Sequence, residues 1–157
     1  MGQYWKIVNL DKREYIDPHK LGSGMKLWEQ LVNTPGVGAA LIILCAAMPK
    51  PPCRPRGGGD LKLDNDVARR TIGRWAGDRV CLVGEYAEDS DLPCFPGFSN
   101  LYSLCVPVSE IDDSDEEDKR TADQLFTDVS DGVCAIIERE LGGKFEGDGW
   151  RHFKTNN

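Results

Sequence analysis

The residues best suited to bind a ligand gather in one short segment, residues 71–86 (TIGRWAGDRVCLVGEY). Two guanidinium groups, an indole and a carboxylate lie close together there, beside two glycines: Arg74, Trp75, Asp78 and Arg79. Arginine holds carboxylates and phosphates through paired hydrogen bonds, and its planar head group stacks on aromatic rings. We therefore predict a ligand-binding surface on these residues, with Trp75 facing a pocket. The alternative is structural, with Arg74 or Arg79 paired to Asp78 or Glu85.

A small hydrolase is the second interpretation, and it depends on the histidines. The chain contains two of them, His19 and His152. An imidazole beside Asp78 and Glu85 could act as a general base on a phosphorylated or otherwise anionic substrate, with or without a divalent metal. The catalytic residues of this alternative are His19, Asp78 and Glu85. The nearby carboxylates do not follow an EF-hand spacing, so we assign no metal site and no cofactor.

A glycine-rich run supplies a further candidate for anion binding. Arg56 precedes three consecutive glycines, whose backbone N–H groups could surround an anion. The run lacks the Gly-Lys-Ser/Thr ending of a P-loop, and the chain contains no G-x-G-x-x-G motif. Residues 50–66 are therefore predicted to form a Gly/Pro-rich loop, with Arg56 as a candidate ligand-binding residue.

The charge balance argues against some classes of partner. The net charge is −7, which disfavours a general nucleic-acid-binding protein. Basic residues concentrate in 50–79 and acidic residues in 85–131, so the two parts could neutralise each other by packing together. The longest apolar run, residues 37–48, is too short to cross a membrane. We expect a protein partner or a small anionic ligand, and neither nucleic acid nor a membrane.

The cysteines indicate a reducing compartment. The six cysteines show no C-x-x-C spacing, and with two histidines in the chain a zinc finger is disfavoured. The first residues contain no apolar signal-peptide core, so we expect a cytoplasmic protein with free thiols. Cys45, Cys81 and Cys134 lie in apolar runs and are predicted to be core residues.

Apolar patterning predicts the strands that must position the binding segment. Residues 4–10 have the pattern of a strand, and residues 14–16 can pair back on it as a hairpin. The β-branched run at 80–83, bracketed by glycines, predicts a buried strand. Residues 67–79 before it are expected to be a second strand or part of a bent one. Residues 144–153 are expected to form a final strand or hairpin.

Three segments have helical character. Ser23 is a good N-cap for a helix reaching Val32, on whose apolar face Trp28 would be a core residue. Thr34 and Pro35 would cap and begin a second helix over residues 37–48, which is apolar on every side and so predicted to be central. A buried strand is the alternative for that segment. A third helix is capped by Ser130, carries Val133, Ile136, Ile137 and Leu141 on one face, and ends in a left-handed glycine cap at Gly142.

The acidic segment 109–120 (SEIDDSDEEDKR) contains few apolar residues and is predicted to be disordered or an exposed loop. Ser109 and Ser114 are each followed three residues later by an acidic residue, a pattern that acidophilic kinases recognise. Such matches are frequent by chance, so an unmodified loop is the simpler interpretation.

Several stretches resemble a family of small cytosolic proteins of uncharacterised activity. They are the opening MGQYWKIVNLDK and its continuation, the RGGGDL loop, GRWAGDR with the strand after it, and the closing ERELGGKFEGDGW. The resemblance covers most of the chain outside the proline-rich and acidic loops. It implies a domain that folds by itself in the cytosol, and it implies no activity, cofactor or catalytic residue.

These observations predict a single α+β domain over residues 1–157, with a small, mostly antiparallel sheet and about three helices on one face. The function expected first is a cytosolic, non-catalytic binding or interaction domain that uses the surface around GRWAGDR. The hydrolase remains the alternative.

Overall fold

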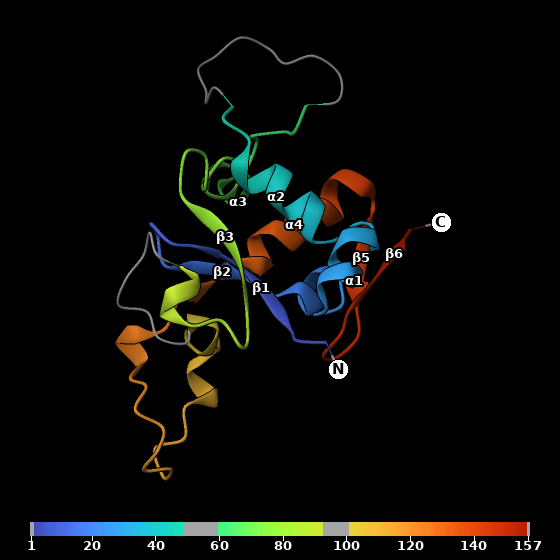
Figure 1. Cartoon of the computed structure of the whole chain (residues 1–157). Coiled ribbons are helices and arrows are strands. Elements are labelled where there is room, and N and C mark those ends of the chain that lie inside the picture. Colours follow the sequence, from blue (N-terminus) through green and yellow to red (C-terminus); the bar gives the residue numbers. More distant parts are fainter. Residues whose placement is uncertain (1, 49–59, 93–100, 157) are drawn as a thin grey trace.

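The central sheet is built from strands that lie far apart in the sequence. The computed structural model describes residues 2–48, 60–92 and 101–156 (Figure 1). Within these residues four strands form a mixed sheet in the order β3–β1–β2–β4, namely β3 (Val80–Gly84), β1 (Trp5–Asn9), β2 (Glu14–Ile16) and β4 (Thr127–Asp128). β1 is antiparallel to β2 and β3, and β4 is parallel to β2. The chain is a single α+β domain, as predicted.

The predicted N-terminal hairpin is confirmed. Ile7 pairs with Ile16 and Asn9 with Glu14 across β1 and β2. The run at Val80 is also a strand, but it lies at the edge of the sheet, where Leu82 is 39% exposed. The expectation of a buried strand is wrong in this respect, because an apolar run alone does not distinguish an edge strand from a central one.

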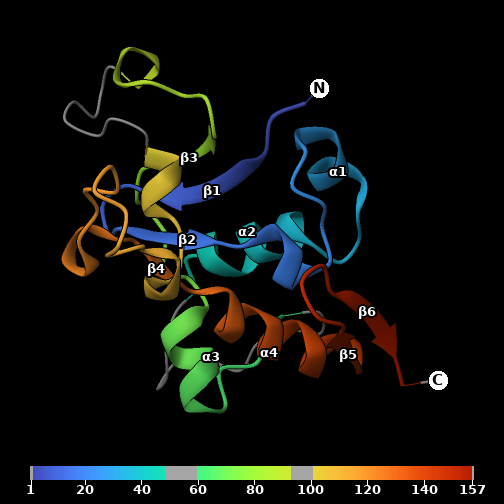
Figure 2. The ribbon, with the colours of Figure 1, turned by 90° about the horizontal axis from the view of Figure 1, so that it is seen from below.

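Three helices cover one face of the sheet (Figure 2). They are α2 (Val37–Cys45), α3 (Asp66–Thr71) and α4 (Ser130–Leu141). Their apolar side chains form one buried cluster with Ile7 and Ile16 of the sheet, with Trp75, and with three residues outside these helices, Leu21, Leu63 and Ile72. The members from the helices are Val37, Ala40, Ile43, Leu44, Ala68, Val133, Cys134, Ile136 and Ile137. About three helices on one face were predicted, but their identity differs, because α3 belongs to this layer and the helix predicted to reach Val32 does not.

The opposite face of the sheet is covered as well, by a segment with little regular structure. Residues 101–126 contain short 3-10 turns at Leu101–Leu104, Val108–Glu110 and Ala122–Gln124. Leu101, Cys105 and Phe126 pack there in a second cluster with Val8, Leu10, Tyr15 and Val83. Adjacent residues of β1 are therefore both buried, on opposite faces, which the expectation of one covered face did not include.

The acidic segment 109–120 is part of residues 101–126, which cover this second face of the sheet, and it forms exposed turns. The carboxylate of Asp112 accepts hydrogen bonds from the backbone N–H and the hydroxyl of Ser114. The Arg120 guanidinium pairs with Asp118 and also donates to the carbonyl of Ser103, which ties the segment to the cover. Ser109 and Ser114 are both exposed. Disorder of this segment and modification of either serine stay predictions.

The first helix differs from its prediction in extent and in the face it buries. α1 is Leu27–Val32, and Ser23 lies outside it. Trp28 is 73% exposed, and Leu31 and Val32 are exposed as well, so the apolar face that was expected in the core points to solvent. The helix is instead anchored by Gln30, whose side-chain amide donates to the backbone carbonyls of Trp5 and Met25.

Residues 37–48 are helical at their start, which decides against the alternative of a strand. α2 begins at Val37, after Gly36, so Thr34 and Pro35 are not its cap and first residue. The hydroxyl of Ser23 accepts the N–H of Val37, so this serine serves the first turn of α2 rather than the helix for which it was predicted. Ile42 and Cys45 are exposed, which makes the expectation of burial on every side wrong.

The C-terminal elements are close to their prediction. α4 buries Val133, Ile136 and Ile137, and it ends at Gly142 with a φ of +68°. The hydroxyl of Ser130 does not cap the helix; it accepts the N–H of Asp17 at the end of β2, and the Ser130 N–H donates to Asp128. A two-stranded hairpin follows, β5 (Gly143–Glu146) and β6 (His152–Thr155).

The segment before β3 is helical, not a strand. Residues Asp66–Thr71 form α3, which is capped by the side chain of Asn65, and residues 72–78 form successive turns. Among the cysteines predicted to be in the core, Cys134 is buried, Cys81 is partly buried and Cys45 is exposed. In the described ranges, no helix has the length and apolar character needed to cross a bilayer.

Candidate functional site

The GRWAGDR segment is held against the end of α2. Gly73 has a φ of +75°, and a Cβ atom at this position would lie 2.5 Å from the carbonyl oxygen of Ala46, so the turn requires glycine. The N–H of Gly73 donates to Ile43, and the N–H of Trp75 donates to Leu44. Both acceptors are carbonyls of the last helical turn, which would otherwise lack intrahelical partners. Backbone hydrogen bonds alone therefore attach the segment to the end of α2.

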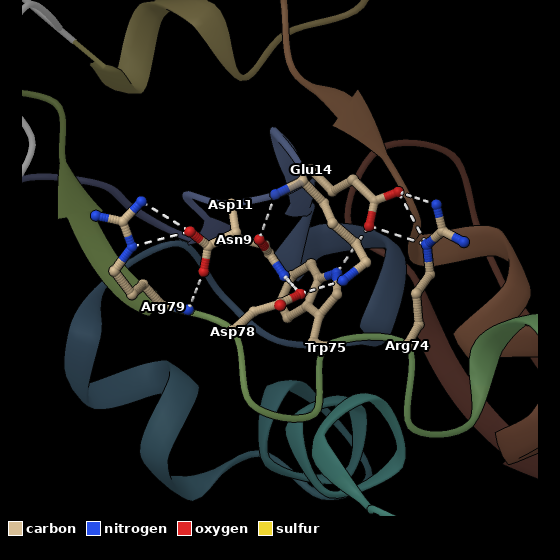
Figure 3. A network of polar contacts seen from close by, with 8 residues as sticks. Asn9, Asp11, Glu14, Arg74, Trp75, Asp78 and Arg79 are labelled. Atoms are coloured by element: carbon tan, nitrogen blue, oxygen red, sulfur yellow. Dashed lines mark hydrogen bonds and ion pairs between the residues drawn. The ribbon is translucent and has the colours of Figure 1, made fainter.

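Trp75 is buried, contrary to the prediction that it faces a pocket. It is 1% exposed and lies in the core with α2 and α4. Its indole N–H donates a 2.9 Å hydrogen bond to the carboxylate of Glu14 (Figure 3). Arg74 binds the same carboxylate through Nε, at 2.9 Å, and through Nη2, at 2.5 Å. Glu14 is only 5% exposed, and the guanidinium and the indole together satisfy its charge.

Asp78 and Arg79 contact the same N-terminal hairpin. The Asp78 carboxylate pairs with the ammonium group of Lys12 and accepts a 2.8 Å hydrogen bond from the side chain of Asn9. These contacts, the Lys12 hydrogen bond first, hold the pKa of Asp78 below its ordinary value. Asp11 accepts hydrogen bonds from the backbone N–H of Arg79, at 2.6 Å, and from its guanidinium, and these bonds lower the pKa of Asp11.

The four residues of the predicted binding surface therefore form a clasp with the β1–β2 hairpin (Figure 3). Structural pairing was the alternative interpretation, but the expected partners, Asp78 and Glu85, are not the observed ones. The actual acidic partners are Asp11 and Glu14, which the sequence analysis missed. The signal that could have found them is a hairpin with two acidic residues near its turn, facing a segment with two arginines.

The residues of the hydrolase interpretation are not brought together. Asp78 and Glu85 lie beyond opposite ends of β3, roughly 20 Å apart along an extended chain. Glu85 accepts the N–H of Tyr4. His19 lies in the 3-10 turn Pro18–Leu21, and its ring stacks on that of Trp150 with centroids 5.6 Å apart. Arg56 and its glycines lie outside the described residues.

A cleft lies near the clasp, between α3 and the start of α4. Its volume is about 530 Å³, within the range of ligand sites. Its lining contains two basic residues, Arg70 and Arg74, and two acidic ones, Asp128 and Asp131. The other lining residues are small or apolar: Val67, Thr71, Val129, Gly132 and Ala135. Arg70 was not singled out by the sequence analysis, which expected residues 67–79 to form a strand and not the helix that carries this residue.

The charges of this cleft differ in how far they are already neutralised. Asp128 is paired with Lys20 at 2.8 Å, and Arg74 is paired with Glu14. Arg70 is exposed, and its Nε donates only to the backbone carbonyl of Asp66, with no carboxylate at ion-pair distance among the residues described. Asp131 is also exposed, at 3.9 Å from Lys20. Arg70 is therefore the cationic group of the cleft that is most available to a ligand.

A second hollow, of about 340 Å³, lies on the other side of Asp128, where Tyr15, Lys20 and Phe126 form part of the lining. Burial raises the pKa of the Tyr15 hydroxyl, which disfavours its ionised form. Within the ranges that the structure covers, histidine, cysteine and acidic side chains do not gather in threes as a metal ion would require.

No family model, curated protein or solved structure matches the chain. The resemblance to a family of small cytosolic proteins stays a prediction.

Proposed function

We propose that the chain is a non-catalytic binding domain that takes a small anionic ligand in the cleft between α3 and α4, and that it acts in the cytoplasm. The observation that carries this proposal is the placement of Arg74. Arg74 is a lining residue of the cleft, and the buried carboxylate of Glu14 fixes the orientation of its guanidinium. A prepositioned guanidinium loses little conformational entropy when it binds a ligand.

Arg70 supplies the second cationic group of the proposed site. It also lines the cleft, and within the part of the chain that the structure describes no carboxylate pairs with it, whereas Arg74 pairs with Glu14. A carboxylate or phosphate between the two arginines would accept charge-assisted hydrogen bonds from both. The remainder of the ligand would lie over Val67 and Ala135, which form the apolar part of the lining. A protein partner would bind the same two arginines with one of its own exposed acidic side chains.

The proposal is tested by titrating the ¹⁵N-labelled protein with pyrophosphate and, separately, with citrate. We expect amide shifts concentrated at Thr71, Gly132 and Ala135, which form part of the cleft lining. Arg70→Gln should weaken binding of the responding probe by about tenfold, the loss of one charge-assisted contact.

Arg69→Gln is the matched control, because Arg69 is the preceding residue of the same helix, pairs with Asp66 and does not form part of the cleft lining. It should change the affinity less than twofold. Absence of shifts for both probes at millimolar concentrations would reject the anion site, and an equal effect of the two substitutions would reject its location.

A further inference from the structure

Among the residues described, the outer edge of β3 offers backbone groups that have no hydrogen-bond partner. Leu10 N–H donates to Arg79 and Glu85 N–H donates to Tyr4, so Arg79 and Glu85 belong to the hydrogen-bonded pairs of the β1–β3 ladder. The alternation of an antiparallel ladder then turns the N–H and C=O groups of Val80 and Leu82, and the N–H of Gly84, away from β1. The carbonyl of Gly84 is already taken by the N–H of Ala87.

The sequence of β3 also lacks the charged residues and prolines that usually prevent strand-to-strand association. The five residues of β3, Val-Cys-Leu-Val-Gly, contain no charged residue and no proline. Leu82 at their centre is 39% exposed. The opposite edge of the sheet is different, because β4 is two residues long and contains a charged residue, Asp128.

We propose that two copies of the chain associate through β3, edge to edge and antiparallel, about a two-fold axis at Leu82. In this register Leu82 pairs with Leu82 of the second copy, and Val80 pairs with Gly84. The N–H groups of Leu82 and Gly84 then donate to carbonyls of the other copy. The sequence of the strand is centred on Leu82, so the contact is self-complementary, as a two-fold interface requires.

The charges that flank β3 favour this occupant. Continuing the register by one residue places Arg79 opposite Glu85 of the second copy, and Glu85 opposite Arg79, so each end of the ladder joins opposite charges. Arg79 is 53% exposed while it pairs with Asp11, so its outer side remains accessible. A parallel arrangement would place like charges side by side at both ends.

A hollow lies beside β3, next to the position that Val80 of the second copy would take in this register. It has a volume of about 370 Å³, and Trp5, Leu82 and Tyr86 form part of its lining. Gly84 carries no side chain, and the proposed pairing places Val80 of the second copy opposite it. The apolar side chain of that valine would lie next to the hollow, which adds apolar burial to the backbone hydrogen bonds.

The dimer leaves the cleft between α3 and α4 accessible. β3 and β4 are the two outer strands of the sheet (Figure 2). The cleft is lined partly by Asp128 of β4. The proposed contact therefore lies away from the cleft. A test of the dimer and a test of anion binding can fail separately.

Sedimentation velocity over a range of protein concentrations tests the proposal, at an ionic strength near 0.15 M, where charges more than about 8 Å apart are screened. We expect a monomer–dimer equilibrium. Leu82→Lys should raise the dimer dissociation constant at least about tenfold, since it places like charges face to face. Ile42→Lys is the matched control, an exposed apolar residue of α2 outside the strand, and should leave the constant unchanged.

Amide hydrogen exchange on the unmodified protein gives a second readout that needs no variant. The N–H groups of Cys81 and Val83 bond to β1 and should be protected at every concentration. The N–H of Leu82 should become protected only as the protein concentration rises. A chain that stays monomeric to millimolar concentration, a dimer insensitive to Leu82→Lys, or a Leu82 amide whose exchange ignores concentration would each overturn the proposal.

Discussion

Trp75 donates its indole N–H to the buried carboxylate of Glu14, so the residue expected to contact a ligand instead joins the GRWAGDR segment to the first hairpin. This hydrogen bond joins the GRWAGDR segment to strand β2, and it is charge-assisted because its acceptor is a carboxylate. Its removal would leave a buried carboxylate with the Arg74 guanidinium alone.

Trp75→Phe should destabilise the fold by about 2–4 kcal/mol, through the lost hydrogen bond to a charged group and the volume left unfilled in the core. Urea denaturation followed by circular dichroism measures this change. Trp28→Phe is the matched control, because Trp28 is 73% exposed, and it should change the free energy of unfolding by less than about 0.5 kcal/mol. Equal effects of the two substitutions would contradict the buried position of Trp75.

The contribution of Asp78 should depend on pH. Lys12 and Asn9 hold its pKa below the ordinary value of 3.8, so its carboxylate stabilises the folded state above the unfolded pKa. That contribution is lost as the pH falls through the folded pKa. Asp78→Asn should therefore be less stable than the parent protein at pH 7, and the difference should shrink as the pH falls below about 4.

Urea denaturation at a series of pH values measures the difference for Asp78→Asn. Asp148→Asn, at an exposed position of the C-terminal hairpin, is the control. If the difference between Asp78→Asn and the parent stayed constant with pH, the ion pair with Lys12 would not be its origin.

The described cysteines should separate into reactive and protected classes. Burial raises the pKa of both Cys105 and Cys134 to about 12, and the thiolate is the form that reacts. Cys45 is exposed on α2. Iodoacetamide at pH 8, followed by mass spectrometry, should modify Cys45 well before either buried thiol, whereas all three should react together in guanidinium chloride. Early modification of Cys105 in the folded protein would refute the burial of the second core cluster.

The side chain of Asn65 should stabilise α3, the helix that carries Arg70. Its oxygen accepts the N–H of Ala68 at 2.8 Å. Asn65→Ala removes this cap and should reduce the free energy of unfolding by about 1 kcal/mol, while Asn65→Asp keeps an acceptor and should stay within about 0.5 kcal/mol of the parent. Thermal unfolding of the three proteins compares them. A loss of the same size in Asn65→Asp would point to a role other than capping.

Much of the secondary structure follows from local pattern, and the errors have a common physical origin. The hairpin of β1 and β2, α2, α4 and the glycine end of α4 depend on nearby residues, and all are present. Trp28 and Trp75 show the limit. Both are tryptophans in amphipathic surroundings, but which of them enters the core depends on packing between distant segments, and that packing buries Trp75 and exposes Trp28.

The polar partners could not be predicted for the same reason. Ser23 has the residue type and position of a cap, but its hydroxyl binds the first turn of the following helix. The structural alternative paired Arg74 or Arg79 with Asp78 or Glu85, whereas Glu14 and Asp11 of the first hairpin are the observed partners. A sequence indicates that such groups need partners, and only the tertiary fold decides which ones they obtain.

The contact between Asp17 and Ser130 joins residues 113 positions apart, next to the parallel pairing of β2 with β4. A ribosome that adds about 5–20 residues per second needs roughly six to twenty seconds to make the intervening chain. During that interval β4 does not yet exist, so the outer edge of β2 exposes backbone groups that can pair with other chains. Nascent chains of this protein should therefore depend on chaperone protection until the last fifth of translation, when β4 and Ser130 are made.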